Sequence, residues 1–283
     1  MNAMAEGSVP IVPDPYFDGM KQPFTIFGPD GTTPVEFSLE DVAAIQINTV
    51  QQAIMFGSQI GASALLLVVL ILMTSSDKRR SAIFLLNGLA LLINTIRNIL
   101  QCLQLVGPFY NFYVYQTEVY ENVPGLSRAK EISITAGILT FLVIVCIEAS
   151  LVLQVRIVCV TLPKVKRYAI TALSTIMALL AIGFRMALLV MNSHSVANVE
   201  TFSAGAMKHL NMVASATNIT LTVSIVFFSI IFCGKLAMAI LSRRTMGLTQ
   251  FGPMQIIFVM GCQTMLLPSK YLTLFIGTSP LLT

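Results

Sequence analysis

The stretch AIMFGSQIGASALLLVVLILMTSSDKRR, residues 53–80, joins a long uncharged and mostly apolar run to a cluster of basic residues. The apolar part, residues 53–73, is long enough to cross a bilayer, since about 20 residues of α-helix span the hydrocarbon core. A helix satisfies its own backbone hydrogen bonds, which water cannot do inside a bilayer. This stretch therefore predicts a membrane-spanning helix that ends in a charged loop.

Five more runs of this kind follow, so the sequence predicts an all-α transmembrane protein with six spans. The predicted spans cover residues 53–73, 82–105, 132–160, 168–191, 210–239 and 253–276, with a short tail at 277–283. Apolar residues make up 55% of the chain and charged residues 11%. This balance fits a polytopic protein whose main partner is the lipid bilayer.

Basic residues collect in alternate loops. The loops after the first, third and fifth predicted spans carry ten Lys and Arg residues with their span ends, and the second and fourth loops carry three. Loops rich in Lys and Arg remain on the cytoplasmic side. Residues 1–50 hold seven acids and one base, Lys21, for a net charge of −6. We therefore expect a multi-pass plasma-membrane protein with its N-terminus outside, and no cleavable signal peptide, because no apolar run precedes Ala53.

The extracellular segment, residues 1–52, is predicted to hold a little structure of its own. Two short strand-like runs, residues 24–27 and 35–37, flank a Gly-Pro-Asp-Gly turn and predict a small hairpin. Ser38 with Asp41 three residues later is typical of a helix N-cap. We expect a short helix there that could run into the first span.

The loop between the second and third spans is rich in aromatic residues, among them Phe109, Tyr110 and Tyr113. One interpretation is an interfacial belt, where the ring and the hydroxyl each meet a suitable environment. The other is a lid over an extracellular ligand, because rigid amphipathic rings supply contact area at little entropic cost. In the second interpretation these three residues bind the ligand.

A charged side chain at membrane depth costs about 2.5–3.5 kcal/mol and is a candidate functional residue, and four such side chains need weighing. They are Arg97, Glu148, Arg156 and Arg185. Arg97 and Arg185 lie toward the outer ends of their spans, where they either reach the interface or line an outer ligand pocket. Glu148 is expected to contact another helix; protonation, Arg156 and Lys235 are the open alternatives for its partner. No chain of further intramembrane acids accompanies it, so a structural or switching contact is favoured over a proton relay.

Small, amide and proline residues in the spans predict how helices meet. Gly57 and Gly61 form a GxxxG motif, which lets a second helix approach closely, either within the chain or across a dimer. Asn87 and Gln263 carry amides that can bond between helices. Pro268 removes a backbone donor and is expected to kink the sixth span.

Several groups of residues share their order and spacing with one known family. They are Gln52–Gly57 with Gly61, Ile83-Phe84 to Asn87, Ile147–Val152 with Gln154, Lys235-Leu236, Ser242-Arg243-Arg244, Gly247-Leu248, Gln250-Phe251, Cys262-Gln263-Thr264 and Leu267-Pro268. On these residues the chain resembles the fungal mating pheromone receptors of the α-factor type, the class D G-protein-coupled receptors. The resemblance extends from about residue 24 to residue 268.

What the resemblance implies is a seven-helix receptor that binds an unmodified secreted peptide pheromone outside and activates a heterotrimeric G protein and the mating response. It also implies roles for single residues. The receptor-dimer face would include Gly57 and Gly61, and the polar contacts between helices would include Asn87 and Glu148. The sixth-helix switch would include Gln263 and Pro268. The loop that faces the G protein would include Arg243, Arg244, Gly247 and Leu248.

The chain departs from this family at its end. The similarity fades after Ser269, and seven residues follow Ile276, so a seventh span does not fit. We therefore expect a chain truncated before the seventh helix, for which a non-signalling form is one outcome.

A six-helix transporter or channel is the alternative function, suggested by the number of spans and by Glu148 and Arg185 at depth. It predicts repeats between the two halves, and none is found. An enzyme is not expected, because the two histidines, His194 and His209, are not spaced as a metal-binding or nucleophile-activating pair. We expect no catalytic residue, metal, cofactor or nucleic-acid partner.

Overall fold

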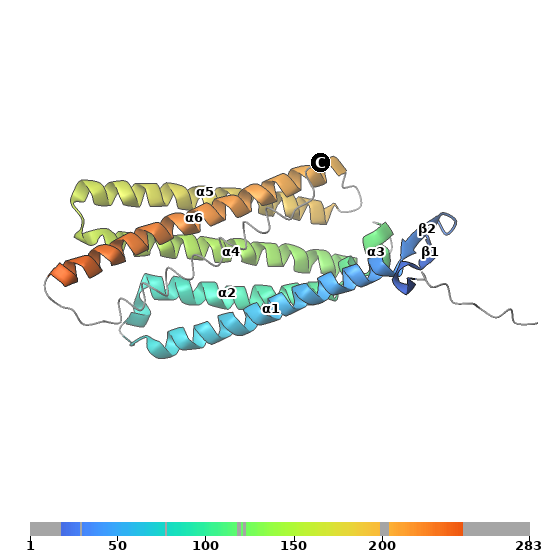
Figure 1. The fold of residues 1–283 in the computed structure, drawn as a ribbon, viewed down its shortest axis with the longest axis horizontal. Helices are drawn as coiled ribbons and strands as arrows, with labels where there is room; N and C mark the ends of the chain where they lie inside the picture. The colour runs from blue at the N-terminus through green and yellow to red at the C-terminus, as the bar shows by residue number, and fades with distance from the viewer. Residues whose placement is uncertain are drawn as a thin grey trace, which may run out of the picture.

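The computed structural model describes residues 18–28, 30–76, 78–117, 120, 123–198 and 204–245. In these ranges five long helices lie lengthwise in a bundle, with a small β-hairpin at one end (Figure 1). The helices are α1 Leu39–Met73, α2 Ala82–Leu105, α4 Leu126–Val158, α5 Lys164–Ala197 and α6 Ala204–Thr245. The shorter elements are η1 Gly19–Lys21, β1 Pro23–Phe27, β2 Pro34–Ser38, η2 Lys78–Arg80, η3 Pro108–Tyr110, α3 Phe112–Thr117 and η4 Cys159–Thr161.

All five long helices have the length and composition to cross a membrane. The shortest, α2, has 24 residues, which is about 36 Å of helix against a hydrocarbon core of about 30 Å. Large apolar side chains lie on the outside of the bundle; Leu72 and Met73, for example, are 73% and 81% exposed. Such a surface is suited to lipid rather than to water. The chain is a multi-pass α-helical membrane protein, as the sequence predicts.

A long helix lies at each of the first five predicted spans, and the sixth, residues 253–276, lies outside the described residues, as does the tail 277–283. The largest difference is in α1, which begins at Leu39 rather than near residue 53. The polar residues before Ala53 belong to the same helix. The predicted short helix is therefore the N-terminal part of α1, and nothing separates it from the first span.

The predicted hairpin is present. β1 and β2 pair antiparallel with Phe24 opposite Phe37, and Gly31 in the turn has a φ of 67°, in the left-handed region that glycine adopts without strain. Ser38 both ends β2 and caps α1: its backbone N–H donates to Asp41 Oδ2 at 2.9 Å, and the Asp41 N–H donates to Ser38 Oγ at 3.3 Å. The hairpin is thus joined to α1 without a linker.

An aromatic cluster attaches the hairpin to the loop between α2 and α4. The Phe112 ring of α3 lies 6.0 Å from the Phe24 ring and 5.7 Å from the Phe37 ring, measured between centroids. At these separations the rings pack against one another. The N-terminal segment and the α2–α4 loop therefore form one cap at this end of the bundle.

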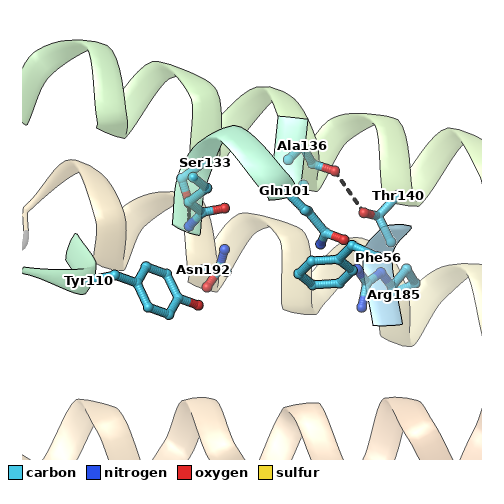
Figure 2. Close-up of a pocket in the computed structure, with 10 residues that line it drawn as sticks. Phe56, Gln101, Tyr110, Ser133, Ala136, Thr140, Arg185 and Asn192 are labelled. Atoms are coloured by element: carbon cyan, nitrogen blue, oxygen red, sulfur yellow. Dashed lines mark hydrogen bonds between the residues drawn. The ribbon is translucent and has the colours of Figure 1, made fainter. Parts of the chain in front are cut away.

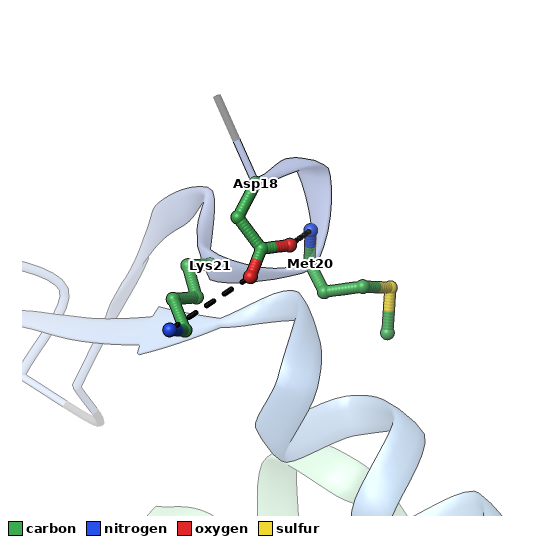
Figure 3. A network of polar contacts seen from close by, with 3 residues as sticks. All are labelled: Asp18, Met20 and Lys21. Carbon is green, nitrogen blue, oxygen red and sulfur yellow. Dashed lines mark hydrogen bonds and ion pairs between the residues drawn. The ribbon is translucent and has the colours of Figure 1, made fainter. Parts of the chain in front are cut away.

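Asp18 begins the described chain and caps η1 (Figure 3). Its Oδ1 accepts from the Met20 N–H at 3.1 Å, and its Oδ2 lies 3.8 Å from Lys21 Nζ. Both side chains of this ion pair are largely exposed, so solvent screens it and it adds little stability.

The helices are held together by small and polar side chains. α4 packs against α2, α5 and α6, and α1 packs against α2. Buried positions at these contacts are mostly small, including Ala129, Ser133, Ala136, Ala178 and Ala181. Because lipid tails are as apolar as leucine, helices in a membrane associate through close backbone approach and polar bonds rather than through apolar burial. The bundle follows that rule.

Candidate functional site

A cavity of about 280 Å³ lies among α1, α2, α4, α5 and η3, toward the hairpin end of the bundle. Its lining residues are Phe56, Gln101, Gln104, Tyr110, Ser133, Ala136, Gly137, Thr140, Arg185 and Asn192. Figure 2 shows Arg185, Gln101 and Phe56 toward one end of the cavity, and Tyr110 and Asn192 toward the other. Most of the lining side chains are polar, which is unusual for space between membrane helices.

The lining follows from helical spacing. Gln101 and Gln104 are three residues apart and share one face of α2. Their neighbours on α4 follow at spacings of three, four and seven and are small: Ser133, Ala136, Gly137 and Thr140. These short side chains leave the space open, and Gln104 Nε2 on α2 donates to Ser133 Oγ on α4 at 3.3 Å.

Tyr110 lines the cavity from the α2–α4 loop. It belongs to η3, and its hydroxyl donates to Gln52 Oε1 on α1 at 3.1 Å. Burial, with a smaller contribution from Tyr115, raises the pKa of Tyr110 above its ordinary value. The phenol therefore stays neutral at physiological pH and keeps its hydrogen to donate.

Phe109 and Tyr113 do not line this cavity. The Phe109 ring packs against Tyr120 at 6.1 Å between centroids. Tyr113 is 38% exposed on α3. Of the four residues predicted to bind a ligand, the structure therefore brings Tyr110 and Arg185 together at the cavity, and leaves Phe109 and Tyr113 in the surrounding cap.

Several polar atoms beside the cavity are buried and lack a hydrogen-bond partner among the described residues. They are Arg185 Nε, Gln101 Oε1, Arg97 Nε and both side-chain polar atoms of Asn98. Arg97 has one long contact, from its Nη1 to Asn94 Oδ1 at 3.4 Å. Buried polar groups are normally satisfied in a native protein, so this concentration needs an explanation.

Deeper in the bundle, Asn87 takes part in a contact between α2 and α4. The Ser150 hydroxyl donates to Asn87 Oδ1 at 2.6 Å and accepts from Gln154 Nε2 at 3.0 Å. These three residues form a polar chain across the helix pair in an otherwise apolar region.

Glu148 is 2% exposed and contacts α6. The Ser224 hydroxyl reaches both of its carboxylate oxygens, at 2.9 and 3.0 Å. Arg156, one of the predicted alternatives, is instead exposed on α4. In the structure Glu148 therefore contacts a neutral hydroxyl, a partner that is not among those predicted from the sequence.

Gly57 and Gly61 lie exposed on α1, and a Cβ added at either position would meet nothing within 4 Å. No described helix of the same chain packs on this motif.

Four other predicted residues lie outside the described residues: Gly247, Leu248, Gln263 and Pro268. Arg243 and Arg244 fall in the last turns of α6, where side chains are not described.

Four residues were not predicted from the sequence: Gln101, Gln104 and Asn192 at the cavity, and Ser224 as the partner of Glu148. A signal for the glutamines was available, because two amides three residues apart put uncharged polar groups on one face of a span. No comparable signal marks Ser224, since serine is common in membrane helices.

The fold and the cavity define a multi-pass helical membrane protein with a polar cavity between its helices. Over residues 17–278 the chain matches the family described as fungal pheromone mating factor STE2 GPCR. The chain belongs to this family of G-protein-coupled receptors, and it is not an enzyme.

Curated relatives agree with this assignment. The pheromone alpha factor receptor of Saccharomyces cerevisiae is 28% identical over 265 residues, which is 90% of this chain and 56% of that protein. The pheromone P-factor receptor of Schizosaccharomyces pombe is 24% identical over 237 residues, 84% of this chain and 67% of that protein. The pheromone alpha factor receptor of Lachancea kluyveri is 25% identical, with 88% and 56% covered. The chain thus spans just over half the length of the two alpha factor receptors.

Proposed function

We propose that this chain is the receptor part that binds a secreted, unmodified α-factor-like peptide pheromone and passes the signal to a heterotrimeric G protein and the mating response. The observation that carries the proposal is a polar cavity beside the cap formed by the hairpin and the α2–α4 loop, in a chain of the pheromone receptor family. The relatives named as alpha factor and P-factor receptors support a peptide rather than a small odorant or an ion.

The hairpin end is proposed to face the outside of the plasma membrane. Basic residues at the opposite end support this orientation, because Lys and Arg favour the cytoplasmic side. Arg79 and Arg80 follow α1 there, and Lys164, Lys166 and Arg167 begin α5. The cavity then opens toward the compartment from which a secreted peptide arrives.

The predicted residues divide between the two sides of the membrane. Tyr110 and Arg185 are proposed to contact the peptide in the cavity, with Phe109 and Tyr113 in the cap above it. The polar contacts of Asn87 and Glu148 are proposed to hold the resting arrangement of helices. Further inward, the proposed sixth-helix switch comprises Gln263 and Pro268, and the proposed G-protein-facing loop comprises Arg243, Arg244, Gly247 and Leu248.

A binding measurement tests this function. Membranes that carry the full-length receptor containing this segment are titrated with a fluorescent synthetic copy of the pheromone encoded in the same genome. We expect saturable binding, weakened about tenfold by Tyr110→Ala, because this substitution removes a ring and hydroxyl from the cavity wall. Tyr168→Ala is the control, since Tyr168 is 65% exposed near the start of α5, at the end of the bundle away from the cavity. Absence of saturable binding would reject the proposal.

A homodimer through α1 is proposed from the exposed Gly57 and Gly61. Replacing both with leucine is expected to lower energy transfer between fluorescently tagged receptors at equal surface expression, because close helix approach needs the small side chains. The fold itself should tolerate the change, since neither position has a neighbour within 4 Å. Ala62→Leu, at a nearby exposed position of α1, is the control. Unchanged energy transfer in the double variant would place the dimer seam elsewhere.

A further inference from the structure

The unpartnered polar atoms near the cavity gather on adjoining faces of α2 and α5. Arg97 and Asn98 precede Gln101 on α2 by four and three residues, so the three side chains lie on neighbouring parts of one helix face. Arg185 reaches the same region from α5, and it lines the cavity together with Gln101. Each lacks a partner for at least one buried polar atom among the described residues.

The charge in this region is of one sign. Arg97 lies near enough to Arg185 for the two guanidinium groups to repel each other, and none of the ten residues that line the cavity is acidic. Two like charges at membrane depth are costly, and within the part of the chain that the structure describes neither is paired with a carboxylate. Charged side chains inside membrane helices commonly mark ligand or ion sites.

We propose that this region is a carboxylate-binding site, in which Arg185, with Arg97 and Gln101 beside it, receives a carboxylate of the peptide ligand. The guanidinium group presents N–H donors in a planar fork that matches the two oxygens of a carboxylate. An unmodified peptide has such a group at its C-terminus, and acidic side chains supply the same chemistry. This inference rests on the proposed function and specifies which chemical group of the ligand goes deepest.

The size of the cavity limits what enters. At about 280 Å³ it is slightly below the range of about 300–1,000 Å³ that holds a whole drug-sized ligand. One end or one side chain of a peptide fits this space, while the rest of the peptide lies in the cap region. The charged region therefore selects a single group of the ligand rather than its whole length.

The first test uses a small probe and needs no pheromone. Thermal unfolding of the purified chain in detergent is followed with N-acetylglycine, which carries a carboxylate, and with N-acetylglycinamide, its neutral analogue. At roughly ten times its dissociation constant, N-acetylglycine is expected to raise Tm by about 4 °C, and the amide to leave it unchanged. Arg185→Gln should abolish the shift, because it removes the charge and keeps hydrogen-bonding groups.

Two further variants sharpen this test. Arg128→Gln alters an arginine that is exposed at the start of α4, and it should retain the full shift. Arg185→Lys keeps the charge and loses the planar fork, so it should retain part of the shift; it also provides a readout if Arg185→Gln fails to fold. Equal shifts from the acid and the amide, or a full shift in Arg185→Gln, would overturn the proposal.

A second arm identifies the source of the carboxylate. The synthetic pheromone is compared as free acid, as C-terminal amide, and with each acidic side chain replaced by its amide. The form that lacks the recognised carboxylate should bind about tenfold more weakly to the wild-type receptor and no more weakly to Arg185→Gln. If every form of the pheromone binds alike, the carboxylate site is rejected and the receptor function stands. If no form binds, the receptor function alone is rejected, because the result with the small probe does not depend on it.

Discussion

Replacing Ser224 with alanine is expected to destabilise the protein by about 2 kcal/mol, which corresponds to a fall in Tm of roughly 5 °C. The Ser224 hydroxyl donates to both oxygens of Glu148, and the two side chains are 0% and 2% exposed. In the variant the carboxyl group stays buried and loses its donor. Leaving a buried polar group without a partner costs more free energy than an average hydrogen bond contributes to stability. The expected loss of stability is therefore larger than the contribution of an average polar contact between membrane helices.

A double variant separates this explanation from a simple loss of packing. Changing Ser224 to alanine and Glu148 to methionine removes both polar groups and keeps most of the volume, so most of the lost stability should return. Ser215→Ala is the control on the same helix, because that exposed hydroxyl bonds only the backbone of its own helix, at Asn211 O. Thermal unfolding in detergent measures all three. A double variant less stable than Ser224→Ala would show that the carboxyl group has another essential partner.

The sequence predicts the parts of this fold that depend on local information. A long apolar run followed by Lys78, Arg79 and Arg80 is sufficient to locate the first span and its C-terminal end. The hairpin and the start of α1 are also local, because Gly31 sets the turn and the Ser38–Asp41 capping box lies within four residues. The start of the membrane-crossing part of α1 is less definite, since the helix extends beyond the apolar run.

Contacts between helices depend on the rotation of each helix about its axis, which the sequence specifies only weakly here. Glu148 and Ser224 are 76 residues apart along the chain. From the sequence, charged residues are the obvious candidates for the partner of Glu148, whereas the structure gives it a serine. Arg185 was recognised as a candidate because a charge in a span is rare. Its neighbours Gln101 and Asn192 were not, because an uncharged amide in a span is a weaker signal.

Aromatic residues in the α2–α4 loop show the same limit. Composition alone predicts that Phe109, Tyr110 and Tyr113 share one role. In the structure the one-turn helix η3 turns Tyr110 toward Gln52 of α1, while Phe109 packs on Tyr120 and Tyr113 lies exposed. In the 3-10 helix η3 each residue is rotated by about 120° from the one before it, so the residue at which η3 begins decides which ring faces inward. The sequence does not fix where η3 begins.

Replacing Ser150 with leucine is expected to destabilise the protein by about 3 kcal/mol, the second large effect. Ser150 is 2% exposed between α2 and α4, and a larger side chain there forces the helices apart or into strained rotamers, at about 1–3 kcal/mol. The same change removes the hydroxyl that bonds Asn87 Oδ1 at 2.6 Å and accepts from Gln154 at 3.0 Å. Lost polar contacts of this kind between membrane helices add about 0.6 kcal/mol or more.

Two matched variants divide this loss into its parts. Ser150→Ala removes the hydrogen bonds without adding volume, so its Tm should fall between those of the wild type and Ser150→Leu. Ser127→Leu makes the same substitution at an exposed position of α4 and should change Tm little. If Ser150→Leu were as stable as Ser150→Ala, the helix pair would have room that the observed burial excludes. Ser150 lies 17 residues from Ser133 along α4, about 25 Å, and the carboxylate site lies near the other end of the bundle. Any Ser150→Leu protein that remains folded should therefore keep the Tm shift with N-acetylglycine.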